Sequence, residues 1–225
     1  TGTRVGEQYG LIALGLFKDW DEINDPNTPV QSFGAVQPGD IKYKDMNGDN
    51  KIDSRDETFL DRVYRPECMY GFSVGYTYKN FDISALFQGA IGGNTWFTGK
   101  TVFPFQSKAA SVLADAKDNH FNEESNPDPH AKWPRLSATD NSNNYRNSTF
   151  WLKKKDYLRL KNVEIGYNMP KSFLSTLHIN SMRVYLTALN LLTWDNLKIA
   201  DPESTEGTGY YPQQSVYNIG VNITF

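Results

Sequence analysis

The 225-residue chain has one cysteine, Cys68, so it can form no internal disulfide and offers no cysteine-built zinc site. It also has no run of about 18 uninterrupted apolar residues, which excludes a transmembrane helix. A transmembrane β-barrel passes this test, because its strands alternate apolar and polar residues. The 23 basic and 26 acidic residues give a formal net charge of −3, which argues against nucleic-acid binding through a basic surface.

The sequence lacks the common signatures of enzymes as well. It contains no phosphate-binding Gly-x-x-x-x-Gly-Lys and no zinc-binding His-Glu-x-x-His, and its three histidines stand far apart. No pair of carboxylates has the setting that a glycosidase requires. We therefore predict that the chain is not an enzyme.

Aromatic residues make up 14% of the chain, a composition that suits β-strands. In residues 216–225, apolar and polar or small residues alternate with a period of two, which predicts a strand with one apolar face. The apolar face carries Tyr217, Ile219, Val221, Ile223 and Phe225. The same alternation runs through residues 70–78, 81–88, 156–169 and 181–191. The fold class that this pattern predicts is all-β, with long antiparallel strands.

The length of these strands separates two all-β architectures. Ten residues at about 3.3 Å each span roughly 33 Å, or about 23 Å when the strand is tilted near 45°. That length matches the ~25 Å apolar band of an outer-membrane barrel, whereas strands of globular proteins are commonly five or six residues long. The strands therefore favour a transmembrane β-barrel.

The connections between the predicted strands are unequal in length. Lys79-Asn80 reads as a tight turn, whereas residues 92–149 form a stretch of little periodicity with four prolines. A connection of that length counts against a compact soluble domain but fits a barrel, which has short periplasmic turns and long extracellular loops. We expect the region of about 92–149 to form long extracellular loops, with a short helix near residues 113–121.

Residues 45–56 contain the most specific local motif. Oxygen-bearing side chains stand at positions 1, 3, 5, 9 and 12 of a calcium-binding loop, and position 7 offers a backbone carbonyl. The side chains are those of Asp45, Asn47, Asp49, Asp53 and Asp56, and the carbonyl is that of Lys51. Position 6 is Asn50 instead of glycine, although asparagine tolerates the left-handed conformation that this turn needs. We predict a structural Ca²⁺ here, the alternative being a polar turn that needs no ion.

The tryptophans allow a second interpretation of the chain. Trp96 and Trp133 could stack on sugar rings and are weak candidates for substrate binding, although a packing role suits each of them equally well. Together with the 45–56 loop, they would suit a soluble, calcium-stabilised β-sandwich that binds carbohydrate. That sandwich is the alternative to a barrel.

A series of short motifs, in order along nearly the whole chain, resembles the C-terminal part of SusC/RagA-like TonB-dependent outer-membrane transporters. Each motif is weak alone, and their order and spacing carry the resemblance. They include Gln37-Pro38-Gly39-Asp40-Ile41-Lys42-Tyr43, Asp45-Met46-Asn47-Gly48-Asp49, Tyr157-Leu158-Arg159-Leu160-Lys161-Asn162, Asp201-Pro202-Glu203 and Gly220-Val221-Asn222-Ile223-Thr224-Phe225.

The resemblance implies that residues 1–225 are the C-terminal portion of a large β-barrel in the outer membrane of a Gram-negative cell. It also implies an importer of oligosaccharides or peptides that works with a SusD-like surface lipoprotein and is energised by TonB. The plug domain through which TonB acts is absent from these residues. Outer-membrane lipid and the cargo would be the other partners, with no nucleic acid among them.

Overall fold

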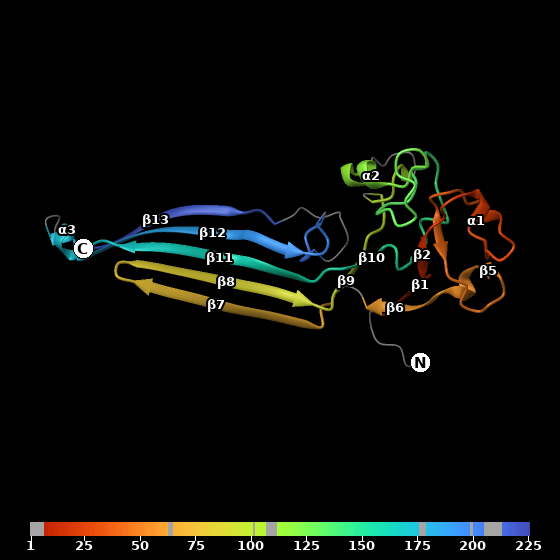
Figure 1. The fold of residues 1–225 in the computed structure, drawn as a ribbon. Helices are drawn as coiled ribbons and strands as arrows, with labels where there is room; N and C mark the ends of the chain where they lie inside the picture. Colours follow the sequence, from red (N-terminus) through yellow and green to blue (C-terminus); the bar gives the residue numbers. More distant parts are fainter. Residues whose placement is uncertain are drawn as a thin grey trace. The chain divides into compact units, whose positions relative to one another are not determined.

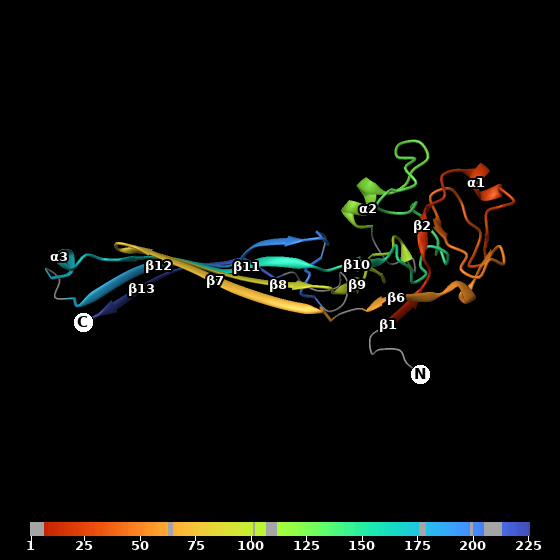
Figure 2. The ribbon, with the colours of Figure 1, turned by 60° about the horizontal axis from the view of Figure 1, so that its bottom comes forward.

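The computed structural model describes residues 7–62, 65–100, 102–106, 112–175, 179–198, 200–204 and 213–225 (Figures 1 and 2). These residues form two compact units. The first comprises the residues up to 65 together with residues 94–153, and the second comprises residues 66–93 and the described residues from 154 onward. Within the described part of the chain, no helix is both long and apolar enough to span a bilayer.

The second unit is built on one five-stranded antiparallel sheet with the strand order β13-β12-β11-β8-β7. The strands are β7 (Cys68–Tyr78), β8 (Phe81–Ile91), β11 (Tyr157–Asn168), β12 (Ser181–Asp195) and β13 (Val216–Thr224). Figure 1 shows them side by side in a single open layer. All the strands that the alternation predicts are present, and four of them have 11 to 15 residues.

The register of the sheet aligns the apolar positions of all five strands. One row across the sheet consists of Ile219, Leu186, Ile165, Ile83 and Tyr76, each paired with the next. The neighbouring row, on the opposite face, consists of Asn218, Thr187, Glu164, Ser84 and Gly75. Because side chains alternate between faces along each strand, the sheet has one continuous apolar face and one polar face. We call these two surfaces the apolar face and the polar face.

The connections differ between the two ends of the sheet. At one end, Lys79 adopts a φ of +54° in the tight turn that joins Tyr78 to Phe81, as the turn signal predicts. At the same end, β11 leads to β12 through the short helix α3 (Lys171–Leu174). At the other end, the chain continues from β8 through about sixty residues before it enters β11. Short turns at one end and long connections at the other are typical of a barrel.

The first unit contains short strands and helices. They are β1 (Glu7–Gly10), β2 (Ala13–Leu16), α1 (Trp20–Asn24), β3 (Val30–Gln31), β4 (Ile41–Tyr43), β5 (Lys51–Ile52), the 3₁₀ helix η1 (Ser54–Asp56), β6 (Thr58–Arg62), β9 (Asn94–Trp96), α2 (Ala114–Asn119) and β10 (Leu152–Lys154). The strand pairs are β1 with β6, β2 with β4, β3 with β5 and β9 with β10. The helix expected near residues 113–121 is present as α2.

An aromatic core holds the first unit together. The Trp151 side chain is 1% exposed, and its ring lies 5.0 Å from that of Phe103 and 5.9 Å from that of Trp133. The described residues of 94–149 therefore belong to a folded core, and backbone hydrogen bonds such as that from the Leu11 N–H to the Asn147 carbonyl (2.9 Å) join them to residues 7–62, although the sequence pattern suggested only long loops. The pattern missed this core because its aromatic residues come from irregular segments that have no period.

Candidate functional site

The apolar face of the sheet extends across all five strands of the second unit. The row that crosses its middle is open to solvent, since Ile219, Leu186, Ile165, Ile83 and Tyr76 are 44–75% exposed. Burying one large apolar side chain is worth about 1.5–3 kcal/mol, so an uncovered row of this kind needs an apolar environment. Among the described residues, no second layer covers it.

Aromatic residues border the apolar face towards both ends. Near the tight turn lie Tyr78, Phe81 and Tyr167, and the rings of Phe81 and Tyr167 are 4.6 Å apart. Near the other end, Trp194 lies on the same face and is 51% exposed. Trp194 shares a row with Leu158 and Gly89, eight residues along β8 from Phe81, which is roughly 27 Å along the strand or about 19 Å across the bilayer at a tilt near 45°. Aromatic residues towards both ends of an apolar face are typical of the girdles that border the apolar band of an outer-membrane barrel.

The polar face carries a three-residue ion cluster that joins three strands. Arg183 on β12 pairs with Asp82 on β8 and with Glu164 on β11, the latter at 2.6 Å from Nη2 to Oε1. The Arg183 side chain crosses Gly166, where an added Cβ would lie 2.3 Å from Nη2. Glycine at 166 therefore leaves room for the guanidinium to reach both carboxylates.

A second ion cluster lies on the polar face, nearer the long connections. Arg159 Nη2 lies 2.9 Å from Asp201 Oδ1, and Nη1 lies 3.3 Å from Glu203 Oε2. Lys161, at an irregularity in the register of β11, adds a third contact, 3.4 Å from Glu203. Sequence patterns did not single out either cluster, because ion pairs between distant residues depend on the register of the strands.

In the first unit, the buried carboxylate of Asp40 connects the 37–43 motif to residues 135–144. Asp40 is 0% exposed, and its Oδ1 accepts hydrogen bonds from the side-chain amides of Asn141 (2.8 Å) and Asn144 (2.9 Å). The same oxygen lies 2.7 Å from Arg135 Nε. Oδ2 accepts from the backbone N–H of Gln37 at 2.8 Å. The asparagine-rich run that reads as a polar loop is thus partly buried around one carboxylate.

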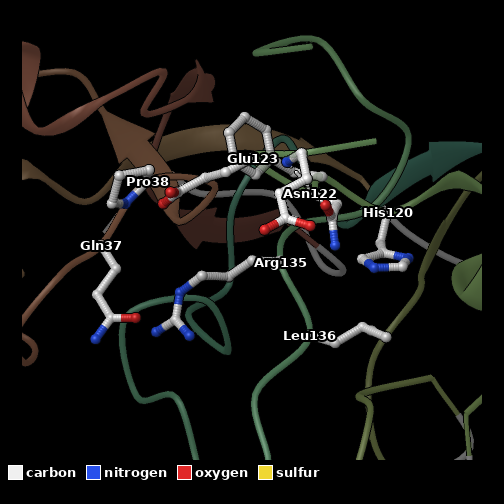
Figure 3. Close-up of a pocket in the computed structure, with 9 residues that line it drawn as sticks. Gln37, Pro38, His120, Asn122, Glu123, Arg135 and Leu136 are labelled. Atoms are coloured by element: carbon white, nitrogen blue, oxygen red, sulfur yellow. Dashed lines mark hydrogen bonds between the residues drawn. The ribbon is translucent and has the colours of Figure 1, made fainter. Parts of the chain in front are cut away.

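A cavity of about 480 Å³ is lined by Arg135, the ion-pair partner of this carboxylate, and by Gln37. Figure 3 shows Gln37 and Pro38 on one side of it, His120 and Leu136 on the other, and the Arg135 guanidinium between them. Two exposed carboxylates, those of Glu123 and Glu124, complete a lining that is mostly polar. The cavity could admit a small polar group, and nothing in the sequence pattern pointed to it.

The 45–56 loop has the turns that a calcium-binding loop requires. Asn50, at position 6, has a φ of +61°, which confirms that asparagine adopts the left-handed conformation there. The Asp45 carboxylate accepts backbone N–H groups from Asn47, Gly48 and Asn50 at 2.7–3.1 Å. Partial desolvation raises the pKa of Asp45, but these N–H groups outweigh that effect and lower it below its usual value.

Inside this loop, Arg55 already pairs with two of the predicted ligands. Its Nη2 lies 2.7 Å from Asp49 Oδ2 and 2.9 Å from Asp53 Oδ2. Hydrogen bonds from the Arg55 side chain and backbone lower the pKa of Asp53 to about 2. Asp56 is 0% exposed and accepts the backbone N–H groups of Met46 and Asp53, and the latter bond completes the capping box of η1, whose N-cap is Asp53.

Some features of this loop therefore suit a metal ion and others do not. The donor types and the turn conformation suit a hard cation. The side chains, however, do not converge: within the described part of the chain, no three His, Cys, Asp or Glu residues are gathered as metal ligands. A bound Ca²⁺ would have to displace Arg55 from Asp49 and Asp53.

The two tryptophan candidates for substrate binding are packed in the first unit. Trp96 is 8% exposed and its indole N–H donates to Gln8 at 3.2 Å. Trp133 is 2% exposed and donates to Asp115 at 2.7 Å. Their rings have little surface for stacking on a sugar, and these contacts favour the packing role that the sequence left open.

Comparison with known proteins places these features in context. TonB-dependent receptors P3 and P26 of Formosa agariphila are 27% and 28% identical to the chain over 238 and 241 residues, which cover 100% and 98% of it. A third receptor from the same organism, P39, is 25% identical over 266 residues. The chain spans only 22–25% of the length of these curated relatives. No family model matches the chain.

Solved structures share the fold. The structure of the RagAB peptide transporter superposes on 97% of the chain with a TM-score of 0.67 and 23% sequence identity, and the chain covers 23% of that protein. The RagAB peptide importer in its open-open state superposes on 100% of the chain, with a TM-score of 0.67 and 21% identity. The open five-stranded sheet is thus part of a larger barrel. The comparisons confirm the resemblance that the motifs indicated: the chain resembles TonB-dependent receptors of the SusC/RagA type over its whole length and shares their barrel fold.

Proposed function

We propose that the chain forms the last strands of an outer-membrane, TonB-dependent importer, together with structured segments outside the bilayer. In this proposal the apolar face contacts outer-membrane lipid and the polar face lines the barrel lumen. The carrying observation is the continuous apolar face, which crosses five strands and lies exposed between two aromatic borders. Arginine substitutions on the two faces test the proposal, because only the apolar face should reject a charge.

The soluble β-sandwich gains no support from the structure. A sandwich buries the apolar face of each sheet against a second sheet, about 10 Å away. In the described residues, the apolar face of this sheet is exposed instead. A sheet of this kind without lipid or detergent around it would aggregate.

The relatives support a proposal for the cargo and the partners. We propose that the cargo is an oligosaccharide or a peptide, and the RagAB structures, titled as a peptide transporter and importer, support the peptide choice. A SusD-like surface lipoprotein would deliver the cargo, and TonB would act through a plug segment that these residues do not contain. Transport breaks no covalent bond in the cargo, so the importer needs no catalytic residues in this chain.

The exposed tip at residues 122–126 is the proposed contact with the lipoprotein or its cargo. The structure defines how to test it: Phe121 is 2% exposed and Ala116 is 0% exposed, so deleting residues 118–129 would also damage the core. The double change Glu123→Ala and Glu124→Ala removes two exposed charges instead. We expect recovery of the lipoprotein in co-purification to fall by roughly threefold or more, since rim charges steer association.

The control for the tip is Lys79→Asn, at the tight turn between β7 and β8 in the second unit. Asparagine tolerates the positive φ of that position, so the sheet should be unaffected. Capture of the lipoprotein should stay at the wild-type level in this variant. Unchanged capture in the Glu123 and Glu124 variant would contradict the placement of the contact.

We also propose that residues 45–56 hold a structural Ca²⁺ when the ion is present. Titration calorimetry should give a Kd of about 10⁻⁴–10⁻³ M, the range of extracellular calcium modules. Arg55→Gln should tighten binding, because the guanidinium no longer competes for Asp49 and Asp53. Asp49→Ala should abolish it, whereas Asp118→Ala, an exposed carboxylate on α2, should not. If neither the wild type nor Arg55→Gln binds calcium, the loop is a polar turn closed by Arg55.

A further inference from the structure

Part of the connection between β12 and β13 contacts the polar face of the sheet. Its described residues 201–204, together with Gln213, are called the strap here. Asp201 of the strap lies 2.9 Å from Arg159, on β11, and Glu203 lies 3.3 Å from the same side chain. The strap is therefore attached to the middle strand of the sheet, and not only to the two strands that it connects.

The attachment is dense and almost closed to water. Arg159 is 2% exposed, and its Nε donates to Thr193 Oγ1 at 2.9 Å. Glu203 also accepts from the Tyr157 hydroxyl at 3.0 Å. Asp201 accepts the backbone N–H groups of Glu203 (2.9 Å) and Gln213 (3.0 Å), which joins the two ends of the strap to one carboxylate. Charge-assisted bonds of this kind are stronger than neutral ones.

The other ion cluster of the polar face has a different role. Arg183, Asp82 and Glu164 all belong to strands, so their contacts join β8, β11 and β12 to one another. No residue of the strap takes part in that cluster. The two arginines can therefore be compared directly: Arg159 holds a connecting segment, whereas Arg183 joins strands only.

We propose that Arg159 is a positioning residue that holds the strap against the inner wall of the barrel, and that the strap narrows the lumen and limits the size of the cargo. This inference rests on the proposed function, in which the polar face lines the lumen. The strap covers part of the polar face, so in the barrel it would occupy space beside the wall that the cargo could otherwise use. Gln88 on β8 is the strand partner of Arg159, so it lies in the wall of the barrel next to the attached strap.

Thiol labelling on intact cells tests the inference in the complete receptor that contains this chain. In a Cys68→Ser background, Ser204→Cys places a reporter on the strap and Gln88→Cys places one on the wall. A water-soluble maleimide of low mass and one carrying a bulky polyethylene glycol are the probes. We expect Arg159→Ala to raise the labelling rate at Ser204→Cys roughly tenfold and to admit the bulky probe to Gln88→Cys, since it removes several charge-assisted bonds.

Arg183→Ala is the matched control and should change neither rate, although it also removes a cation from the polar face. Equal rates in the Arg159 variant and the wild type, or equal increases in both arginine variants, would overturn the role of Arg159. If Arg159→Ala raised the labelling rate at Ser204→Cys but did not admit the bulky probe to Gln88→Cys, the claim that the strap narrows the lumen would be wrong. Rapid labelling of Ile219→Cys by the same water-soluble probes would instead show that the apolar face does not contact lipid, and so would refute the proposed function itself.

Discussion

Ile219→Arg should prevent the protein from assembling in the outer membrane. Ile219 is 75% exposed on the edge strand β13, in the row that crosses the middle of the apolar face with Leu186, Ile165 and Ile83. An arginine that faces lipid near the middle of the bilayer costs about 2–4 kcal/mol. The measurement is the amount of folded, heat-modifiable protein in the outer-membrane fraction, which we expect to fall sharply.

Asn218→Arg is the control for this substitution, one residue away on the same strand. Asn218 belongs to the polar face, opposite Thr187, so the proposal places its side chain in the water-filled lumen. This variant should assemble nearly as well as the wild type. The pair Val221→Arg and Asn222→Arg repeats the comparison nearer the tight turn. If the arginines on both faces assembled equally well, the apolar face would not be a lipid contact.

Asp40→Ala should cause the largest loss of stability in the first unit. It removes a carboxylate that is 0% exposed and leaves Arg135, Asn141 and Asn144 without their shared partner. Breaking a buried ion pair by removing one partner costs about 3–5 kcal/mol. Urea unfolding followed by tryptophan fluorescence should show the loss, because Trp133 and Trp151 are buried in this unit.

Two variants separate the role of the Asp40 charge from a general effect of substitution. Asp40→Asn keeps the shape but loses the charge, so we expect an intermediate shift of the urea midpoint. Asp118→Ala, an exposed position on α2, should change the stability by no more than about 0.5 kcal/mol. A midpoint for Asp40→Ala equal to that of Asp118→Ala would show that the buried carboxylate does not hold the unit together.

The sheet was the most predictable part of the molecule. The period-two pattern predicted each long strand to within a few residues, because one face of every strand is apolar and the other is polar or small. The tight turn at Lys79 was also predictable, since two alternating runs met at a two-residue signal. The strand β12 extends to Asp195, beyond the predicted end at Leu191. The pattern did not predict these last residues because the register shifts between Leu160 and Asn162, which changes the alternation along the paired strand.

The first unit could not be predicted in the same way. Residues 92–149 have little periodicity, and their described part is nevertheless packed around Trp151, Trp133 and Phe103. Their asparagines read as a solvated loop, yet Asn143 and Asn144 are 1% and 2% exposed. A buried polar group needs a specific partner, and that partner, Asp40, lies about a hundred residues away.

The strands, the two faces and the calcium-like turns of residues 45–56 were predictable from the sequence alone, because each of these depends on neighbours within about a dozen residues. Three sets of contacts became visible in the folded chain and not before: Arg159 holds Asp201 and Glu203, Arg183 joins three strands, and Arg55 pairs with two carboxylates expected to bind calcium. The physical reason is that an ion pair needs two side chains within about 4 Å of each other. Strand register and loop packing set that distance, and periodicity along the chain does not encode it.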